Sequence, residues 1–449
     1  MQFSIVAERP TNGDRQLFVY DNATNTLSTP DGYVYEATPG APSAASVTPA
    51  KRFSKADPLR KGTRVRLLKI QMGLSCNYAC TYCSQRFVER ADETSAKHVA
   101  QFLGLLDNLE FDEATGLKIE FWGGEPFVYW KTMKPLAEAL RDRFEPWQKP
   151  PRMSVITNGS LLSREINDWL VMMGFSVAVS HDGPGQHVRG PDPLADPEQR
   201  RWIMDLYKRL RPVGRFSFNA VLNKDNQSRK AIFDWFVAIT GDPAVPLGEG
   251  DMIDAYDSDG KATSLDGDEA HFAFRRQAFN DIFATGGNIG FGGTLRKIDS
   301  FTQAVLTHEP SVALPQKCGM DDEAVLAVDL RGNVITCQNV SAVATAGNGS
   351  PHLGGNIRAM DKVALRSATH WSNREHCAGC PVLHLCRGSC MYLEGDLWAT
   401  SCANSYSDNI VFFALSFEKL TNGYIPIFID GGDLPPDRRN IWGTYEAAA

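Results

Sequence analysis

The chain has 449 residues, of which 43% are hydrophobic and 22% charged, and its net charge is −7. This composition is typical of a globular protein with room for one large domain and a smaller one. Acidic and basic residues are mixed along the chain, which argues against nucleic-acid or anionic-lipid partners. The N-terminus lacks a signal-peptide pattern, and no apolar run reaches the roughly 18 residues of a membrane span. We therefore expect a cytoplasmic protein without membrane contact.

The N-terminal residues 1–65 differ in character from those that follow. Two β-like runs, 17–20 and 33–35, flank a turn-prone stretch at 21–25 and predict a hairpin. Residues 39–50 are rich in Pro, Ala and Ser, which predicts a linker.

From 66 to 300, short β runs alternate with amphipathic helices. A helix is expected at 163–173, for example, because its apolar residues recur at helical spacing. Such alternation predicts βα units and a parallel sheet. The expected strands are 67–70, 118–122, 154–156, 176–180, 216–222 and, more weakly, 251–254. About six units are too few for a closed eight-stranded barrel, so we expect an α/β fold with a partial (β/α)6 TIM-like barrel, whose chemistry lies at the C-terminal strand ends.

The regular alternation stops near 305. Turns, glycines and cysteines dominate up to 402, which indicates a small domain at 301–410 held by metal rather than by a large core. A final helix is expected through 410–415, within a C-terminal helix and tail at 411–449.

The ten cysteines are unevenly distributed, with three at 76–83, none at 84–317 and seven at 318–402. Clustered cysteines in a reducing compartment bind metal or react more often than they form disulfides. Cys76, Cys80 and Cys83 have C-x3-C-x2-C spacing directly after the first expected strand. Three thiolates can bind three irons of a [4Fe–4S] cluster and leave the fourth iron open. The alternatives are a chance trio or a zinc site, but zinc wants four ligands and no nearby residue completes the set.

Three further motifs follow the next three strands in order: GGEP at 123–126, TNG at 157–159 and S-x-D-G at 180–183. Together with the cysteine triplet they resemble the radical SAM (S-adenosylmethionine) superfamily over residues 66 to about 300. In that family SAM occupies the open iron, and an electron from the cluster cleaves it to a 5′-deoxyadenosyl radical that abstracts a hydrogen atom. His181 departs from the apolar residue usual there, and we expect it to be packed or solvent-facing rather than to touch substrate.

The resemblance implies which residues contact SAM. Glu125 matches the residue that binds the amino group, with the glycines before it allowing close backbone approach. Ser180 and Arg189 match contacts to the ribose and carboxylate, and Tyr82 an aromatic near the adenine. The complete implied set is Gly123, Gly124, Glu125, Asn158, Ser180, Arg189, Tyr82 and Val221.

The seven later cysteines, with Gly332 between the first two, resemble the signature of the SPASM domain, which carries two auxiliary clusters. The resemblance implies a distal cluster on Cys377, Cys380, Cys386 and Cys402, and a nearer one on Cys318, Cys337 and Cys390. The nearer cluster then has only three thiolates, so we expect an open iron or a ligand such as His308, Glu309 or Gln316. A zinc ribbon on the distal four is the alternative, but it leaves the other three cysteines unexplained.

Enzymes with a SPASM domain mostly modify peptides. We therefore expect three [4Fe–4S] clusters, SAM, an electron donor such as flavodoxin or ferredoxin, and oxidative cross-linking of a ribosomally made precursor peptide. Gln338 stands where the sulfatase-maturing branch, which makes formylglycine, has an aspartate base, so that branch ranks lower. Epimerisation remains an alternative, but it needs a hydrogen-atom donor, commonly a cysteine thiol, and all ten cysteines are already assigned to clusters. A small-molecule radical SAM enzyme and an iron–sulfur electron carrier remain alternatives, and no catalytic residue is assigned.

Overall fold

The computed structural model describes residues 1–37, 47–287 and 289–445. Six parallel strands follow one another across the central sheet in chain order. They are β5 (Leu67–Gln71), β6 (Lys118–Trp122), β7 (Arg152–Thr157), β8 (Ser176–Ser180), β9 (Phe216–Leu222) and β10 (Leu247–Met252). This arrangement confirms the partial barrel, in which the carboxyl ends of the strands meet at one edge.

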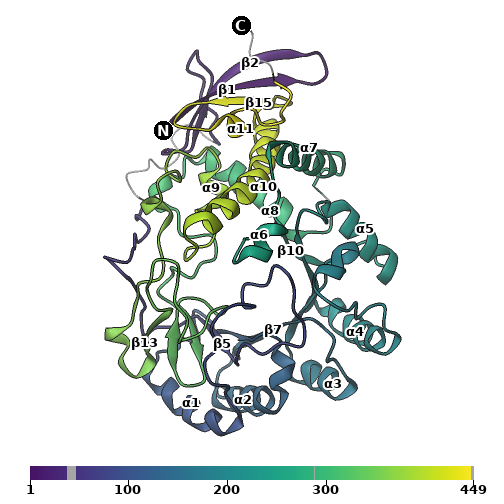
Figure 1. Cartoon of the computed structure of the whole chain (residues 1–449), viewed down its shortest axis with the longest axis vertical. Helices are drawn as coiled ribbons and strands as arrows, with labels where there is room; N and C mark the ends of the chain where they lie inside the picture. The colour runs from purple at the N-terminus through teal and green to yellow at the C-terminus, as the bar shows by residue number, and fades with distance from the viewer. Residues whose placement is uncertain (38–46, 288, 446–449) are drawn as a thin grey trace.

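The connecting helices lie along the outside of this sheet (Figure 1). They are α1 (Val99–Leu105), α2 (Trp130–Arg143), α3 (Arg164–Met173), α4 (Pro197–Leu210) and α5 (Arg229–Thr240). The helix expected at 163–173 is α3, whose N-cap Ser163 accepts a hydrogen bond from the Ile166 amide at 3.3 Å. Gly174 ends α3 in the left-handed region, with φ at 71°. No helix in the described ranges combines the length and apolarity that a membrane crossing requires.

The central sheet continues into the cysteine-rich region, which the sequence reading did not anticipate. Strand β11 (Val325–Asp329) pairs in parallel with β5, and the antiparallel strands β12 (Asn333–Ile335) and β13 (Leu353–Asn356) extend the sheet further. All five residues of β11 are buried. A short run that is buried throughout and almost entirely apolar has no period, so hydrophobic patterning does not distinguish it from part of a buried helix.

The C-terminal helix is much longer than the expected 410–415. Helix α10 (Gly395–Thr421) carries Cys402 and packs against α7 (Asp268–Ala284) and α8 (Gly292–Leu306). Its first half buries polar side chains, including Ser401, Asn404 and Ser405. Because these positions are buried yet polar, the hydrophobic pattern that predicts a helix begins only at Ile410.

A separate antiparallel sheet, the terminal sheet, joins the two ends of the chain (Figure 1). Its order is β15 (Ile425–Asp430), β1 (Gln2–Arg9), β2 (Asp14–Asp21) and β3 (Thr26–Ser28). The predicted hairpin is thus partly wrong, since β2 pairs with β1 and β3, and residues 33–35 add only a Ser28–Val34 bridge. The expected C-terminal tail contains two regular elements, β15 and α11 (Pro436–Arg439). Of the expected linker, 39–46 lies outside the described residues and 47–50 has no regular structure.

Candidate functional site

A cavity of about 480 Å³ opens at the carboxyl ends of the barrel strands. The cysteine loop that follows β5 forms one wall, and residues at the ends of β6, β7, β8, β9 and β10 form the others. The structure brings the whole predicted set of first-cluster cysteines and SAM contacts to this cavity, which is lined by Cys76, Cys80, Cys83, Tyr82, Gly123, Gly124, Glu125, Asn158, Ser180, Arg189 and Val221. Residues that the chain separates by up to 145 positions therefore share one site.

The cysteine loop presents three thiols that influence one another. Burial, with the charges of Cys83 and Cys76 adding to it and that of Arg189 opposing it, raises the pKa of Cys80 to about 12. Backbone amides donate to two of the sulfurs, from Tyr78 to Cys76 at 3.3 Å and from Gln85 to Cys83 at 3.4 Å. Buried thiols of high pKa become thiolates when a metal binds them, and amide hydrogen bonds to sulfur are usual around iron–sulfur clusters. The loop fits a cluster with one open iron.

Glu125 is a buried carboxylate directed into the same cavity. It accepts hydrogen bonds from the amides of Phe127 (3.0 Å) and Asn158 (2.7 Å) and from the Thr157 hydroxyl (2.8 Å). Burial raises the pKa of Glu125 to about 7, although these three donors lower it. A buried acid with this pKa gains most from a cationic partner, so Glu125 fits an ammonium group.

Gly124 is required by the packing of two loops. A Cβ on this residue would lie 2.4 Å from the carbonyl oxygen of Ser75 and 2.6 Å from that of Leu74. The Glu125 amide in turn donates to the Ser75 carbonyl at 3.0 Å. The glycine-rich turn thus packs directly against the start of the cysteine loop. This packing requires glycine at 124, whereas the sequence analysis explained the glycines by close approach of the backbone to the ligand.

Asp182 organises the opposite wall of the cavity. It lies 3.0 Å from the Arg189 Nε, and it accepts hydrogen bonds from the Tyr82 hydroxyl and, at 3.0 Å, from the Val221 amide. Three predicted SAM contacts therefore share one buried carboxylate, which the sequence reading did not single out. The neighbouring His181 is fully buried and packed, with its Nε2 2.8 Å from Asp192, as expected.

A group of charged residues around the end of β10 was not expected from the sequence. Asp251, Asp254, Tyr256 and Lys317 all line the cavity. Asp251 is paired with Lys297 at 2.5 Å and Lys317 at 3.0 Å. Asp254 instead accepts a hydrogen bond from the Ser389 hydroxyl at 2.7 Å, and burial raises its pKa. The sequence did contain an indication of these two aspartates, because both belong to the weak strand expected at 251–254.

The cysteines of the nearer auxiliary set are close to this cavity. Burial raises the pKa of Cys337 to about 11, with the Cys318 charge adding to the effect, and Cys390 feels the charges of both. The Gln85 side-chain amide donates to the side-chain oxygen of Asn339 at 3.0 Å and so ties the first cysteine loop to the loop after Cys337. Asn339, rather than Gln338, lines the cavity.

The suggested fourth ligands of this set have other contacts. The Gln316 side chain accepts from the Trp371 amide at 3.3 Å, and the His308 Nδ1 lies 3.4 Å from the Thr26 hydroxyl. Glu309 lines a separate cavity beside α8.

The four distal thiols also form an interacting set around one small cavity. Burial raises the pKa of Cys377, and the charges of Cys386, Cys402 and Cys380 raise it further. All ten cysteines are free thiols. Within the described ranges no three His, Cys, Asp or Glu side chains converge on one metal ion. A [4Fe–4S] cluster takes one thiolate at each of four separate irons, so it suits thiols that are grouped without converging.

Comparisons with known proteins give the following similarities. A model described as the radical SAM superfamily matches residues 70–236. The radical SAM cyclopropyl synthase TigE of Paramaledivibacter caminithermalis is 24% identical over 193 residues, which are 40% of this chain but only 38% of TigE. The structure of native anSMEcpe with bound AdoMet and Cp18Cys peptide has a TM-score of 0.56 and 20% identity, over 80% of this chain and 98% of that one. The structure of Streptococcus suis SuiB bound to S-adenosylmethionine has a TM-score of 0.46 and 14% identity, over 75% of this chain and 77% of that one. The likeness to anSMEcpe is one of fold.

Proposed function

Because residues 70–236 form a radical SAM domain, we propose that this chain is a peptide maturase that oxidatively cross-links residues of a ribosomally made precursor peptide. The observation that carries the proposal is the single cavity that gathers the cysteine triplet, Glu125 and a second wall of charged residues. The relatives agree with it in two respects. TigE is named for making a cyclopropyl group, which requires a new bond at carbon, and anSMEcpe holds a peptide in a fold shared by this chain.

The cavity residues divide the work of binding. A [4Fe–4S] cluster on Cys76, Cys80 and Cys83, with SAM at its open iron, supplies a hydrogen-abstracting radical when bound. Glu125 then holds the SAM ammonium, while Arg189 and Ser180 on the opposite wall contact its polar groups. Auxiliary clusters on the seven later cysteines, and an electron donor of the flavodoxin or ferredoxin class, complete the redox machinery.

Cross-linking two carbons removes two hydrogens from the peptide. One hydrogen would leave as a hydrogen atom, and the other as a proton and an electron. Auxiliary clusters held by the seven later cysteines would supply the acceptor for that electron. The proton needs a base, and Gln338 cannot act as one.

We assign the proton to Asp254. Of the cavity carboxylates described above, Glu125 is engaged by three donors and Asp251 by two lysines. Asp254 bears only hydroxyl donors, from Ser389 at 2.7 Å and Tyr256 at 3.5 Å. Burial raises the pKa of Asp254 against the charge of Lys317, which is itself paired with Asp251. A carboxylate that is held by hydroxyl groups and has no ion pair of its own among the described residues is suited to accept a proton.

The test is anaerobic co-expression with any short peptide that is encoded beside this gene, followed by mass spectrometry. The expected product is lighter by two hydrogens for each cross-link. The Cys76/Cys80/Cys83→Ala variant should lose about a third of its iron and all SAM cleavage. Asp254→Asn should still cleave SAM but give little product. An unmodified peptide alongside rapid formation of 5′-deoxyadenosine would instead favour a small-molecule substrate.

A further inference from the structure

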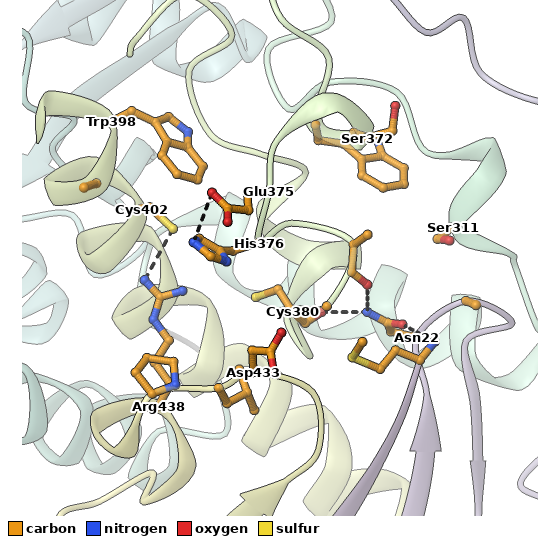
Figure 2. A pocket seen from close by; sticks show the side chains of 18 of the residues that line it. Asn22, Ser311, Ser372, Glu375, His376, Cys380, Trp398, Cys402, Asp433 and Arg438 are labelled. Carbon is orange, nitrogen blue, oxygen red and sulfur yellow. Dashed lines mark hydrogen bonds and ion pairs between the residues drawn. The ribbon is translucent and has the colours of Figure 1, made fainter. Parts of the chain in front are cut away.

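Arg438 contacts one of the four distal thiols directly. Its Nη2 donates to the Cys402 sulfur at 3.4 Å, as Figure 2 shows. The guanidinium also lies 4.8 Å from the ring centroid of the buried Tyr406, whose hydroxyl donates to the Arg438 carbonyl at 2.7 Å. In the described part of the chain the guanidinium forms no ion pair with a carboxylate. Its charge is therefore directed at the thiols.

Asn22 holds the other side of the same set. Its buried side-chain amide donates to the carbonyls of Ala378 at 3.0 Å and Cys380 at 2.9 Å, and so fixes the turn between Cys377 and Cys380. The Asn22 carbonyl also lies 2.8 Å from the Nε2 of His384. In Figure 2 Asn22 and Arg438 approach the cysteine loop from opposite sides of a cavity of about 750 Å³.

Both residues are positioned by the terminal sheet. Asn22 directly follows β2, and Arg438 lies in α11, shortly after β15. Strand β1 pairs with both of these strands, so the two ends of the chain are held together beside the cysteines. Residues 1–37 therefore have a structural role beside the distal cysteines, which a hairpin on the surface would not have.

We propose that the terminal sheet supports the distal cluster, with Arg438 as the positioning residue that raises its reduction potential and Asn22 as the residue that secures its cysteine loop. Reduction adds negative charge to a cluster, and a cationic hydrogen-bond donor at a ligating sulfur stabilises that charge. Contacts outside the ligands commonly change metal affinity by about 10–100-fold. The proposal rests on a cluster at Cys377, Cys380, Cys386 and Cys402, and it does not depend on the peptide substrate.

The potential is measured on the reconstituted full chain by redox titration with paramagnetic resonance. The titration is done in the Cys76/Cys80/Cys83→Ala background, and the distal signal is the one that Cys402→Ala removes. Arg438→Met should shift the ratio of oxidised to reduced cluster about tenfold toward oxidised at a fixed potential, which is about 59 mV for one electron. Arg439→Met is the matched control, because Arg439 pairs with Asp430 at 3.2 Å and should leave the midpoint unchanged.

Arg438→Gln provides a second measurement if Arg438→Met does not hold iron. It is neutral but keeps an amide donor, so its midpoint should move in the same direction by a smaller amount. A wild-type midpoint in whichever of the two variants retains the distal signal overturns the role of Arg438.

The Asn22 contact is tested by iron release to a chelator. Asn22→Ala should release distal iron about tenfold faster than wild type, whereas Asn12→Ala, in the exposed β1–β2 turn, should not. Equal rates for all three proteins overturn the role of Asn22. If wild-type protein has no signal that depends on Cys402, the distal cluster itself is wrong, whatever the peptide assay gives.

Discussion

Arg229 donates to Asp408 across 2.6 Å, and both side chains are almost fully buried, at 2% and 3% exposure. Arg229 begins α5 of the barrel and Asp408 lies in the middle of α10, so the pair joins the barrel to the C-terminal helix. Asp408→Ala leaves a buried guanidinium unpaired, and we expect it to cost about 3–5 kcal/mol in free energy of unfolding. Denaturant unfolding measures this. Asp299→Ala, at an exposed pair with Lys419, should cost less than about 1 kcal/mol; equal losses would contradict the assigned role.

Gly124→Ala should damage the first iron site without touching a ligand. The added methyl group meets two backbone carbonyls at the start of the cysteine loop, which must move. We expect a loss of about 1–3 kcal/mol in stability and of up to a third of the bound iron. Gly104→Ala is the control, because its Cβ would meet no atom within 4 Å and alanine favours its helix. Normal iron content in Gly124→Ala would show that the glycine-rich turn and the cysteine loop do not pack this closely.

The affinity for SAM should depend on pH through Glu125, whose pKa burial raises to about 7. In the free protein the neutral acid is favoured, so its contribution to stability is complete below about pH 4.5 and is lost as the pH rises through about 7. The SAM ammonium favours the ionised form instead. Binding should therefore weaken by up to about tenfold per pH unit below about pH 7, and weaken again above about pH 8 as the amine loses its proton.

Equilibrium dialysis of SAM with wild type and Glu125→Gln measures this dependence. The variant should bind about 2–4 kcal/mol more weakly and lose the dependence below pH 7, with its iron content unchanged. Glutamine is preferable to alanine because it keeps an acceptor for the Phe127 amide and the Thr157 hydroxyl. Glu120→Gln, whose carboxylate lies 3.5 Å from Lys69, is the matched control. Wild-type affinity that is flat from pH 6 to 7 would exclude Glu125 as the titrating group.

The sequence predicted the barrel and its cavity because both depend on local signals. Each strand is an apolar run followed by a distinctive turn, and parallel strands bring those turns to one edge. It did not predict the terminal sheet, whose strands β1 and β15 lie more than 400 residues apart and pair only after folding. Nor did it predict Arg438 beside Cys402 or Asp254 beside Ser389, since contacts between distant loops leave no spacing in the chain. The first half of α10 was not predicted for a different reason. Its buried residues are polar, so they show no apolar period.

The nearer auxiliary set, Cys318, Cys337 and Cys390, offers three thiolates to a cluster that takes four ligands. His308 and Gln316 are engaged elsewhere, and we expect the fourth iron to be open or labile at rest. Paramagnetic resonance of the Cys76/Cys80/Cys83→Ala variant tests this. Adding a small thiol or the cognate peptide should produce a new or shifted auxiliary signal.

Further substitutions decide which group, if any, fills the fourth position. His308→Ala and Glu309→Ala should leave that signal unchanged, because the histidine contacts Thr26 and the glutamate lines a different cavity. If the auxiliary signal does not change when thiol or peptide is added, but does change in either variant, the protein itself supplies the fourth ligand. Asp254 can be tested for both roles, because its charge acts on Cys390 and it also lines the cavity that gathers the predicted SAM contacts. If Asp254 is the base, Asp254→Asn keeps the auxiliary spectrum and loses peptide modification; if it is the fourth ligand, the spectrum changes before any peptide is added.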